Sequence, residues 1–130
     1  SHDGHGLKCT HACMHAFMEE RMGVSIEIRQ AVICADAGRC FYCGHPATGV
    51  DHIDSRKAGG SDKPDNLVAA CATCNGLKRD RPIPETLRAD AKATAFMRCD
   101  MIERMAGEAR AAAQRARARR VIPIMERDFR

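Results

Sequence analysis

Two pairs of cysteines, each pair separated by two residues, form the most specific chemical pattern in this chain. The pairs are Cys40 with Cys43 and Cys71 with Cys74. Four thiolates supplied by two tight turns make a closed tetrahedral shell for Zn²⁺. Four unbound structural cysteines or a rubredoxin-type iron site are the alternatives, and the paired spacing favours zinc. The insert between the pairs, residues 44–70, is longer than a minimal zinc site needs, so we expect it to carry a further site.

Three residues near the cysteines suit a second, open metal site with a base beside it. Asp51 and His52 are adjacent, so on a strand their side chains point to opposite faces unless the strand bends. Asn75 directly follows Cys74, and zinc bound there would fix the direction of Asn75. A carboxylate and an amide oxygen suit Mg²⁺ or Mn²⁺. A histidine of ordinary pKa, ~6.5, can take a proton from water, although a lone histidine is more often structural.

Size and composition indicate one small domain with a mildly basic surface. The chain has 130 residues, a formal net charge of +4, no Trp and one Tyr. Arginine outnumbers lysine, and arginine matches phosphate bidentately, so nucleic-acid affinity and a merely soluble basic surface both explain the charge. Because no signal peptide or membrane-length apolar run is visible, we expect a reducing cytoplasm and no membrane partner. Residues 1–8 are expected to be a flexible end.

Local patterns divide the chain into three parts within that domain. Residues 10–37 predict two helices, the first over 10–22 and the second starting after Ser25 and ending before Gly38. Residues 38–82 predict a mixed core whose pieces follow in order: a tight turn at 40–44, a strand at 48–53, a loop at 54–64, an extended segment at 66–70 and a short helix at 71–79.

The third part, residues 85–130, predicts a long helix and a tail. Residues 85–120 have high helix propensity. Their apolar stripe consists of Leu87, Ala91, Met97, Met101, Ile102 and Met105. Residues 121–125 are apolar and interrupted by Pro123, and we expect them to dock back onto the body.

The central residues resemble the HNH, or His-Me finger, endonucleases, which have a ββα-metal fold. The resemblance covers about residues 25–82. Its elements stand in the family's order: Cys40-x-x-Cys43, Asp51-His52-Ile53, Gly59-Gly60-Ser61-Asp62, Asp65-Asn66-Leu67 and Cys71-x-x-Cys74-Asn75-x-x-Lys78. It implies an α+β fold: a small ββα finger held by a four-cysteine zinc site, with N-terminal helices before it and a long C-terminal helix after it.

The resemblance also implies a role for each matching residue. His52 matches the general base that activates water, and Asp51 matches the metal ligand before it. Asn66 matches the asparagine that braces the loop and orients the histidine. Asn75 matches the third metal-binding position, where many members have histidine. The implied reaction is metal-dependent cleavage of DNA to 5′-phosphate and 3′-hydroxyl ends. The family's proline after the Asp-His-Ile segment is replaced here by Asp54-Ser55-Arg56, which leaves the loop path open.

Basic residues near the motif and in the last helix are candidate DNA contacts, although a solvated basic face explains them equally well. They are Arg56, Lys57, Lys78, Arg79, Arg81, Arg115, Arg117, Arg119 and Arg120. A second metal site is a weaker hypothesis, because ordinary core or surface thiols explain its residues as well. Its candidates are Cys9, His11, Cys13 and His15, joined by Cys34 and Cys99.

The sequence therefore favours an intracellular, bacterial or phage-encoded nuclease that nicks DNA. A non-catalytic, zinc-stabilised nucleic-acid-binding module and a scaffold whose long helix binds a partner are the alternatives. The biological role, the sequence preference and the choice between monomer and homodimer stay open at this level.

Overall fold

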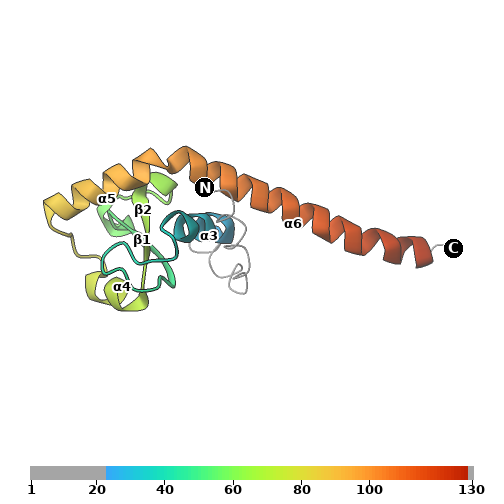
Figure 1. Ribbon diagram of the computed structural model, residues 1–130, viewed down its shortest axis with the longest axis horizontal. Coiled ribbons are helices and arrows are strands. Elements are labelled where there is room, and N and C mark those ends of the chain that lie inside the picture. Colours follow the sequence, from blue (N-terminus) through green and yellow to red (C-terminus); the bar gives the residue numbers. More distant parts are fainter. Residues whose placement is uncertain (1–22, 129–130) are drawn as a thin grey trace.

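The computed structural model describes residues 23–128, so the helix expected over residues 10–22 lies outside the described residues. In chain order the elements are helix α3 (Ile26–Ala35), strand β1 (Gly49–His52), the short 3₁₀ helices η1 (Arg56–Ala58) and η2 (Pro64–Asn66), strand β2 (Leu67–Ala70), and helices α4 (Ala72–Lys78), α5 (Glu85–Met97) and α6 (Cys99–Asp128). This order confirms the α+β class, with the β-β-α unit between an N-terminal helix and a long C-terminal helix (Figure 1).

The centre of the fold is an antiparallel hairpin of two four-residue strands. Gly49 pairs with Ala70, and His52 pairs with Leu67. Every residue of β2 is fully buried. The strand runs directly into Cys71, whose Sγ accepts a hydrogen bond from Cys74 N at 3.4 Å and caps α4. The hairpin therefore delivers the second cysteine pair to the start of a helix.

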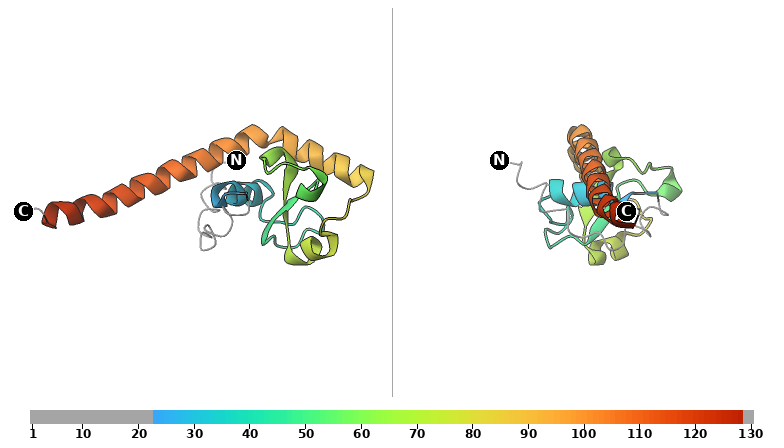
Figure 2. Two further views of the ribbon diagram at one scale, coloured as in Figure 1. Left: turned by 180° about the vertical axis from the view of Figure 1, so that it is seen from behind. Right: turned by 90° about the vertical axis from the view of Figure 1, so that its right-hand side faces the viewer.

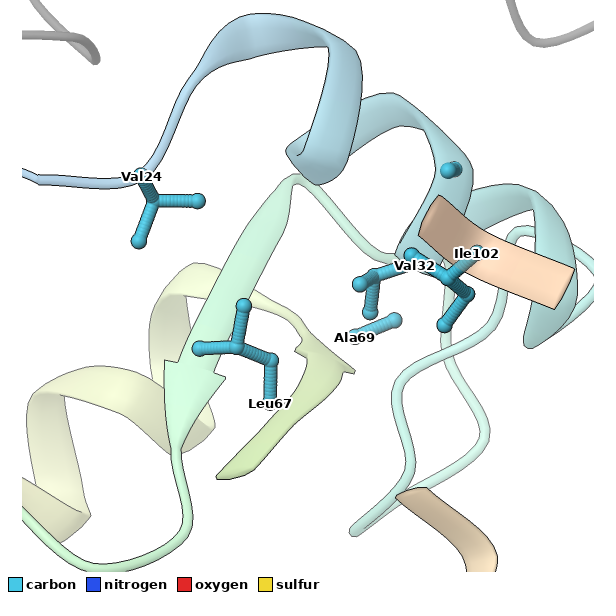
Figure 3. Packing of buried hydrophobic residues seen from close by; sticks show 6 residues of the cluster. Val24, Val32, Leu67, Ala69 and Ile102 are labelled. Atoms are coloured by element: carbon cyan, nitrogen blue, oxygen red, sulfur yellow. The ribbon is translucent and has the colours of Figure 1, made fainter. Parts of the chain in front are cut away.

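Helix α3 covers one face of the hairpin. Ser25 caps it as predicted, since its Oγ accepts from Ile28 N at 3.2 Å. The helix ends before Gly38, whose φ of +74° is unfavourable for residues with a side chain. Val32 packs there with Leu67, Ala69 and Ile102 in the main apolar cluster (Figure 3).

The prediction of a single helix over residues 85–120 is wrong, because the helix is interrupted at Arg98, between α5 and α6. The Arg98 guanidinium pairs with Asp36 and donates to the Leu67 carbonyl oxygen at 3.2 Å. Asp36 also accepts from Ala69 N at 2.8 Å. This buried contact holds the helix junction against α3 and β2, which outweighs continuous helix propensity.

The break also changes which apolar residues are buried. Ala91 and Ala95 of α5 pack against Ile53 and Val68 in a second cluster. Ile102 of α6 is fully buried, as its place in the apolar stripe predicts. Met97 is 84% exposed, so its place in that stripe is wrong. Each helix thus covers a different part of the hairpin.

The expected docking of residues 121–125 is also wrong. Helix α6 continues through Pro123 to Asp128 and projects away from the body (Figure 2). Val121 and Ile122 are 44% and 53% exposed. A proline removes one helical hydrogen bond, yet the helix continues on both sides of Pro123. Within residues 23–128, no helix is long and apolar enough to cross a membrane.

The core assignment predicts a large difference between two neighbouring substitutions. Ile102→Ala is expected to lower the free energy of unfolding by about 2–4 kcal/mol, because it opens a cavity in the main cluster. Met97→Ala, at an exposed position, should change it by less than about 0.5 kcal/mol. Urea unfolding followed by circular dichroism measures both values, and equal losses would contradict this packing.

Candidate functional site

The structure brings the four predicted cysteines together. The Sγ atoms of Cys40, Cys43, Cys71 and Cys74 all lie within 4.8 Å of one another. Cys43 Sγ is 3.6 Å from Cys71 Sγ, close to the ~3.8 Å between thiolates that each bind one Zn²⁺ at ~2.3 Å. Among the described His, Cys, Asp and Glu side chains, this is the one group arranged for a metal ion. The donor set fits a structural zinc ion.

A tight turn forms the first half of this cluster. Cys40 N donates to the His45 carbonyl oxygen at 2.6 Å, and Gly44 N donates to the Cys40 carbonyl oxygen at 2.9 Å. His45 Nδ1 lies 3.3 Å from Cys43 Sγ, where a donated proton would stabilise a thiolate. The turn therefore supplies both ligands and a polar neighbour for one of them.

Asp51 leaves β1 on the side of α4 and the cysteine turn. Its carboxylate is only 7% exposed. The Tyr42 hydroxyl donates to Asp51 Oδ2 at 2.6 Å, and Lys78 Nζ lies 3.2 Å from the same oxygen. Lys78 also donates to the His52 carbonyl oxygen at 2.8 Å. Burial and the bond to Asp51 raise the pKa of Tyr42, so the phenol keeps its proton and remains a donor to the carboxylate.

His52 leaves the same strand towards the loop between β1 and β2. Its Nε2 is 2.8 Å from Asp62 Oδ1, and Arg56 Nε donates to that oxygen at 3.0 Å. The bonds from Arg56 and then from His52 lower the pKa of Asp62, so its carboxylate stays ionised at neutral pH. Asp62 was not among the predicted site residues, although it closes the Gly-Gly-Ser-Asp segment of the motif.

Asn66 joins the two ends of that loop. The side chain is 1% exposed, and its Oδ1 accepts from Asp54 N at 2.9 Å. Its Nδ2 donates to the carbonyl oxygens of Asp54 and Ser61 at 2.9 and 2.8 Å. Gly60 passes so close to the Asp54 carbonyl that a Cβ would overlap it. The loop that carries Asp62 is therefore held at both ends by one amide.

Helix α5 fixes the same loop from outside. Arg88 donates to both carboxylate oxygens of Asp54, at 2.7 and 2.8 Å, and Lys92 Nζ lies 3.6 Å from Asp54 Oδ2. The bond to Arg88 lowers the pKa of Asp54, so this ion pair persists at neutral pH. Asp54 follows Ile53 where the family often has proline, and here a bidentate ion pair directs the loop.

Asn75 lies in the first turn of α4, against β1. Its backbone N–H donates to the Cys71 carbonyl oxygen at 3.0 Å, and its side-chain Nδ2 donates to the Val50 carbonyl oxygen at 3.4 Å. The amide oxygen, which is the atom that binds hard cations, is not used in this bond. Val50 precedes Asp51, so an amide oxygen and a buried carboxylate border one stretch of strand. Oxygen donors of this kind fit Mg²⁺ or Mn²⁺.

Comparison with known proteins relates the central part of the chain to one family. Residues 40–81 match the model of the HNH endonuclease family. The matched segment also has the β-β-α order and the four-cysteine cluster expected of an HNH finger. A solved structure, that of the type IV phosphorothioation-dependent restriction endonuclease ScoMcrA, is also similar, with 23% identity and a TM-score of 0.42. The similarity covers 83% of this chain but 22% of ScoMcrA, so the chain spans about a fifth of that protein's length. No curated protein matches the chain.

The basic residues of the HNH segment are placed very differently from one another. Lys78 is 7% exposed and pairs with Asp51 inside the finger, and Arg56 pairs with Asp62. The Arg79 and Arg81 side chains donate to carbonyl oxygens of α4. Lys57 is 82% exposed, with Asp80 3.9 Å away. Lys57, Arg79 and Arg81 thus keep the surface position expected of DNA contacts, whereas Lys78 serves the interior.

The weaker metal-site hypothesis stays a prediction, because most of its candidate residues are not among the described ones. Cys9, His11, Cys13 and His15 lie outside the described residues. Cys34 is disulfide-bonded and is therefore not a free ligand. Burial raises the pKa of the Cys99 thiol, and Cys99 is not part of the group of described side chains that is arranged for a metal ion.

The cysteine cluster predicts a metal requirement for folding. Cys71→Ser should lower bound zinc from one equivalent to almost none and remove most of the cooperative unfolding transition, because zinc affinity is folding free energy here. Cys99→Ser, outside the cluster, should keep zinc and fold. Metal analysis and circular dichroism measure both effects. Less than half an equivalent of zinc in the pure wild-type protein would contradict the assignment.

Proposed function

We propose that this chain is a metal-dependent DNA endonuclease of the HNH type that hydrolyses phosphodiester bonds and nicks one strand at a time. The observation that carries the proposal is the geometry of β1. Asp51 points from this strand towards α4, which holds Asn75, and His52 points towards Asp62 in the loop. His52 is held by the Asp62 carboxylate, and the buried carboxylate of Asp51 lies on the other face of the strand. A module that only binds nucleic acid needs neither arrangement.

His52 acts as the general base through Nδ1. An ionised carboxylate can only accept hydrogen bonds, so the contact with Asp62 requires the proton of the neutral ring to be on Nε2. Nδ1 then carries the lone pair and can take a proton from the attacking water. Asp62 is a positioning residue, because it acts through the orientation and tautomer of His52. Arg56 and Asn66 hold Asp62 and its loop in place.

Asp51 and Asn75 would hold the catalytic divalent ion, Mg²⁺ or Mn²⁺. When bound, such an ion neutralises charge on the scissile phosphate and stabilises the departing 3′-oxygen. Tyr42 fixes Asp51 Oδ2 from the cysteine turn, and Lys78 balances the charge of the buried carboxylate from α4. Both supports come from segments that carry the cysteine ligands, so a zinc ion bound there would help to position the second metal site.

DNA is the proposed partner. Lys57, Arg79 and Arg81 surround α4 and the loop between the strands, where exposed cations can contact phosphates. A monomer has one such site and cuts one strand, so cutting both strands would require a homodimer or two successive cuts.

The central prediction concerns His52. His52→Ala should lower the rate of supercoiled-plasmid cleavage at least about 10²-fold in Mg²⁺ or Mn²⁺, because the water loses its base. Zinc content and thermal stability should stay at wild-type values. If wild type and variant leave the plasmid intact, or cut it equally, the enzyme assignment fails. Plasmid binding without cleavage would favour the zinc-stabilised binding module.

A second prediction tests Asp62. Asp62→Asn should lower kcat at least about tenfold with little change in KM, because an amide no longer selects the Nε2–H tautomer. ¹⁵N NMR of the imidazole should show a loss of that tautomer. Asp65→Asn is the matched control: it removes the same charge from the same loop, and Asp65 bonds to Ser61 rather than to His52. Equal effects of the two variants on kcat would exclude the role of Asp62.

A further inference from the structure

The second half of α6 carries an unusual concentration of positive charge. From Ala109 to Met125 the helix contains five arginines and no acidic residue. Arg110 contacts the body, with Nε 3.5 Å from a Glu27 carboxylate oxygen. The other four, Arg115, Arg117, Arg119 and Arg120, are exposed and form no hydrogen bond or ion pair with the described residues. Their charge is available to a partner.

The arginines form two rows rather than one face. Residues three, four or seven apart lie above one another on a helix, since successive residues are ~100° apart. Arg115 and Arg119, four apart, make the first row. Arg110, Arg117 and Arg120, separated by seven and three, make the second row. The arginines together occupy about 220° of the circumference.

A strip of small residues separates the two rows. Ala112 and Ala116, four apart, lie between the row of Arg115 and the row of Arg120 on the shorter way around the helix. The opposite side of the helix carries Ala118 and no arginine. The segment therefore presents two lines of cations with room for close approach between them.

This arrangement fits a groove with two negative walls. The DNA major groove is ~12 Å wide and admits an α-helix of ~10–12 Å diameter, with a phosphate strand on each side. A helix resting on one phosphate strand would use one row and leave the other in solvent. A second copy of the chain would bring like-charged rows together, which is unfavourable.

Helix α6 is also held so that it can reach a partner as a rigid rod. Ile102 is fully buried and Ala106 is 1% exposed against the body, and Arg110 marks the last contact with α3. Beyond it the helix projects away from the other described elements in Figure 1 and in the left view of Figure 2. A helix that is already formed therefore lowers the cost of ordering this arm on binding.

We propose that residues 109–120 of α6 lie in the major groove of duplex DNA, with one arginine row against each phosphate strand and Ala112 and Ala116 facing the groove floor. This inference rests on the proposed function only in taking DNA as the ligand. It assigns binding to a part of the chain distant from His52, so binding and cleavage are tested separately.

The decisive experiment compares two alanines with the same charge change. Binding of a ~20-bp duplex is measured by fluorescence anisotropy in the His52→Ala background without added Mg²⁺. Ala112→Glu should weaken binding about tenfold or more, because a carboxylate enters the groove between phosphates. Ala118→Glu, on the side away from the groove, should weaken it less than about threefold. Circular dichroism checks that both variants stay helical. Equal losses would overturn the groove geometry.

The two rows are then tested separately. Arg115→Gln with Arg119→Gln, and Arg117→Gln with Arg120→Gln, should each reduce the slope of log K against log salt by about 2, since each phosphate contact contributes ~0.9. Loss from only one pair would indicate contact with a single strand and overturn the proposal. Displacement by the minor-groove ligand netropsin, but not by the major-groove ligand methyl green, would also overturn it.

A failure of this inference is distinguishable from a failure of the proposed function. Wild-type cleavage that depends on His52, combined with unchanged binding in all α6 variants, would retain the nuclease and remove the helix from DNA recognition. Duplex binding that follows the predicted pattern, without any cleavage, would retain the helix contact and remove the enzyme.

Discussion

The four-cysteine cluster is the constraint on which the rest of this small fold depends. The cluster joins the turn before the hairpin to the helix after it. Two residues that contact the candidate site are neighbours of its cysteines in the sequence. Tyr42 lies between Cys40 and Cys43, and Asn75 follows Cys74. When these thiolates converge, a phenol and an amide from two segments are brought against the same strand, β1. A two-stranded sheet of this size is marginal by itself, so a metal ion bound there would contribute both stability and geometry.

Buried polar groups give the finger its specificity. Asp51 and Asn66 are 6% and 1% exposed, yet each has partners for its polar atoms. Burial of such groups is favourable only when their hydrogen bonds are complete, so the structure tolerates few alternative arrangements of the loop or of α4. The fixed orientations of the Asp51 and His52 side chains follow from this. Partners from different segments hold the two side chains on opposite sides of β1.

The outer helices serve the finger in two ways. Arg88 of α5 holds Asp54 at the start of the loop, and Arg98 at the junction with α6 joins Asp36 to the Leu67 carbonyl. Both contacts link residues more than thirty positions apart in sequence. These ion pairs hold the ends of the hairpin, while its strands are covered by apolar side chains. Helix α6 then extends beyond the body, where its charge rather than its packing distinguishes it.

The sequence by itself determined the cysteine pairs, the β-β-α order and the cap at Ser25, because these depend on residue type and short-range spacing. It also singled out Asp51, His52, Asn66 and Asn75, whose roles stay predictions. Only the tertiary structure decided the contacts of Asp62, Tyr42 and Lys78, because ion pairs between distant residues leave no periodic signal. The same reason explains the break at Arg98, where one buried pair overrides helix propensity. The tertiary structure also decided the path of residues 121–125, since α6 continues through them and their apolar side chains lie exposed among the described residues.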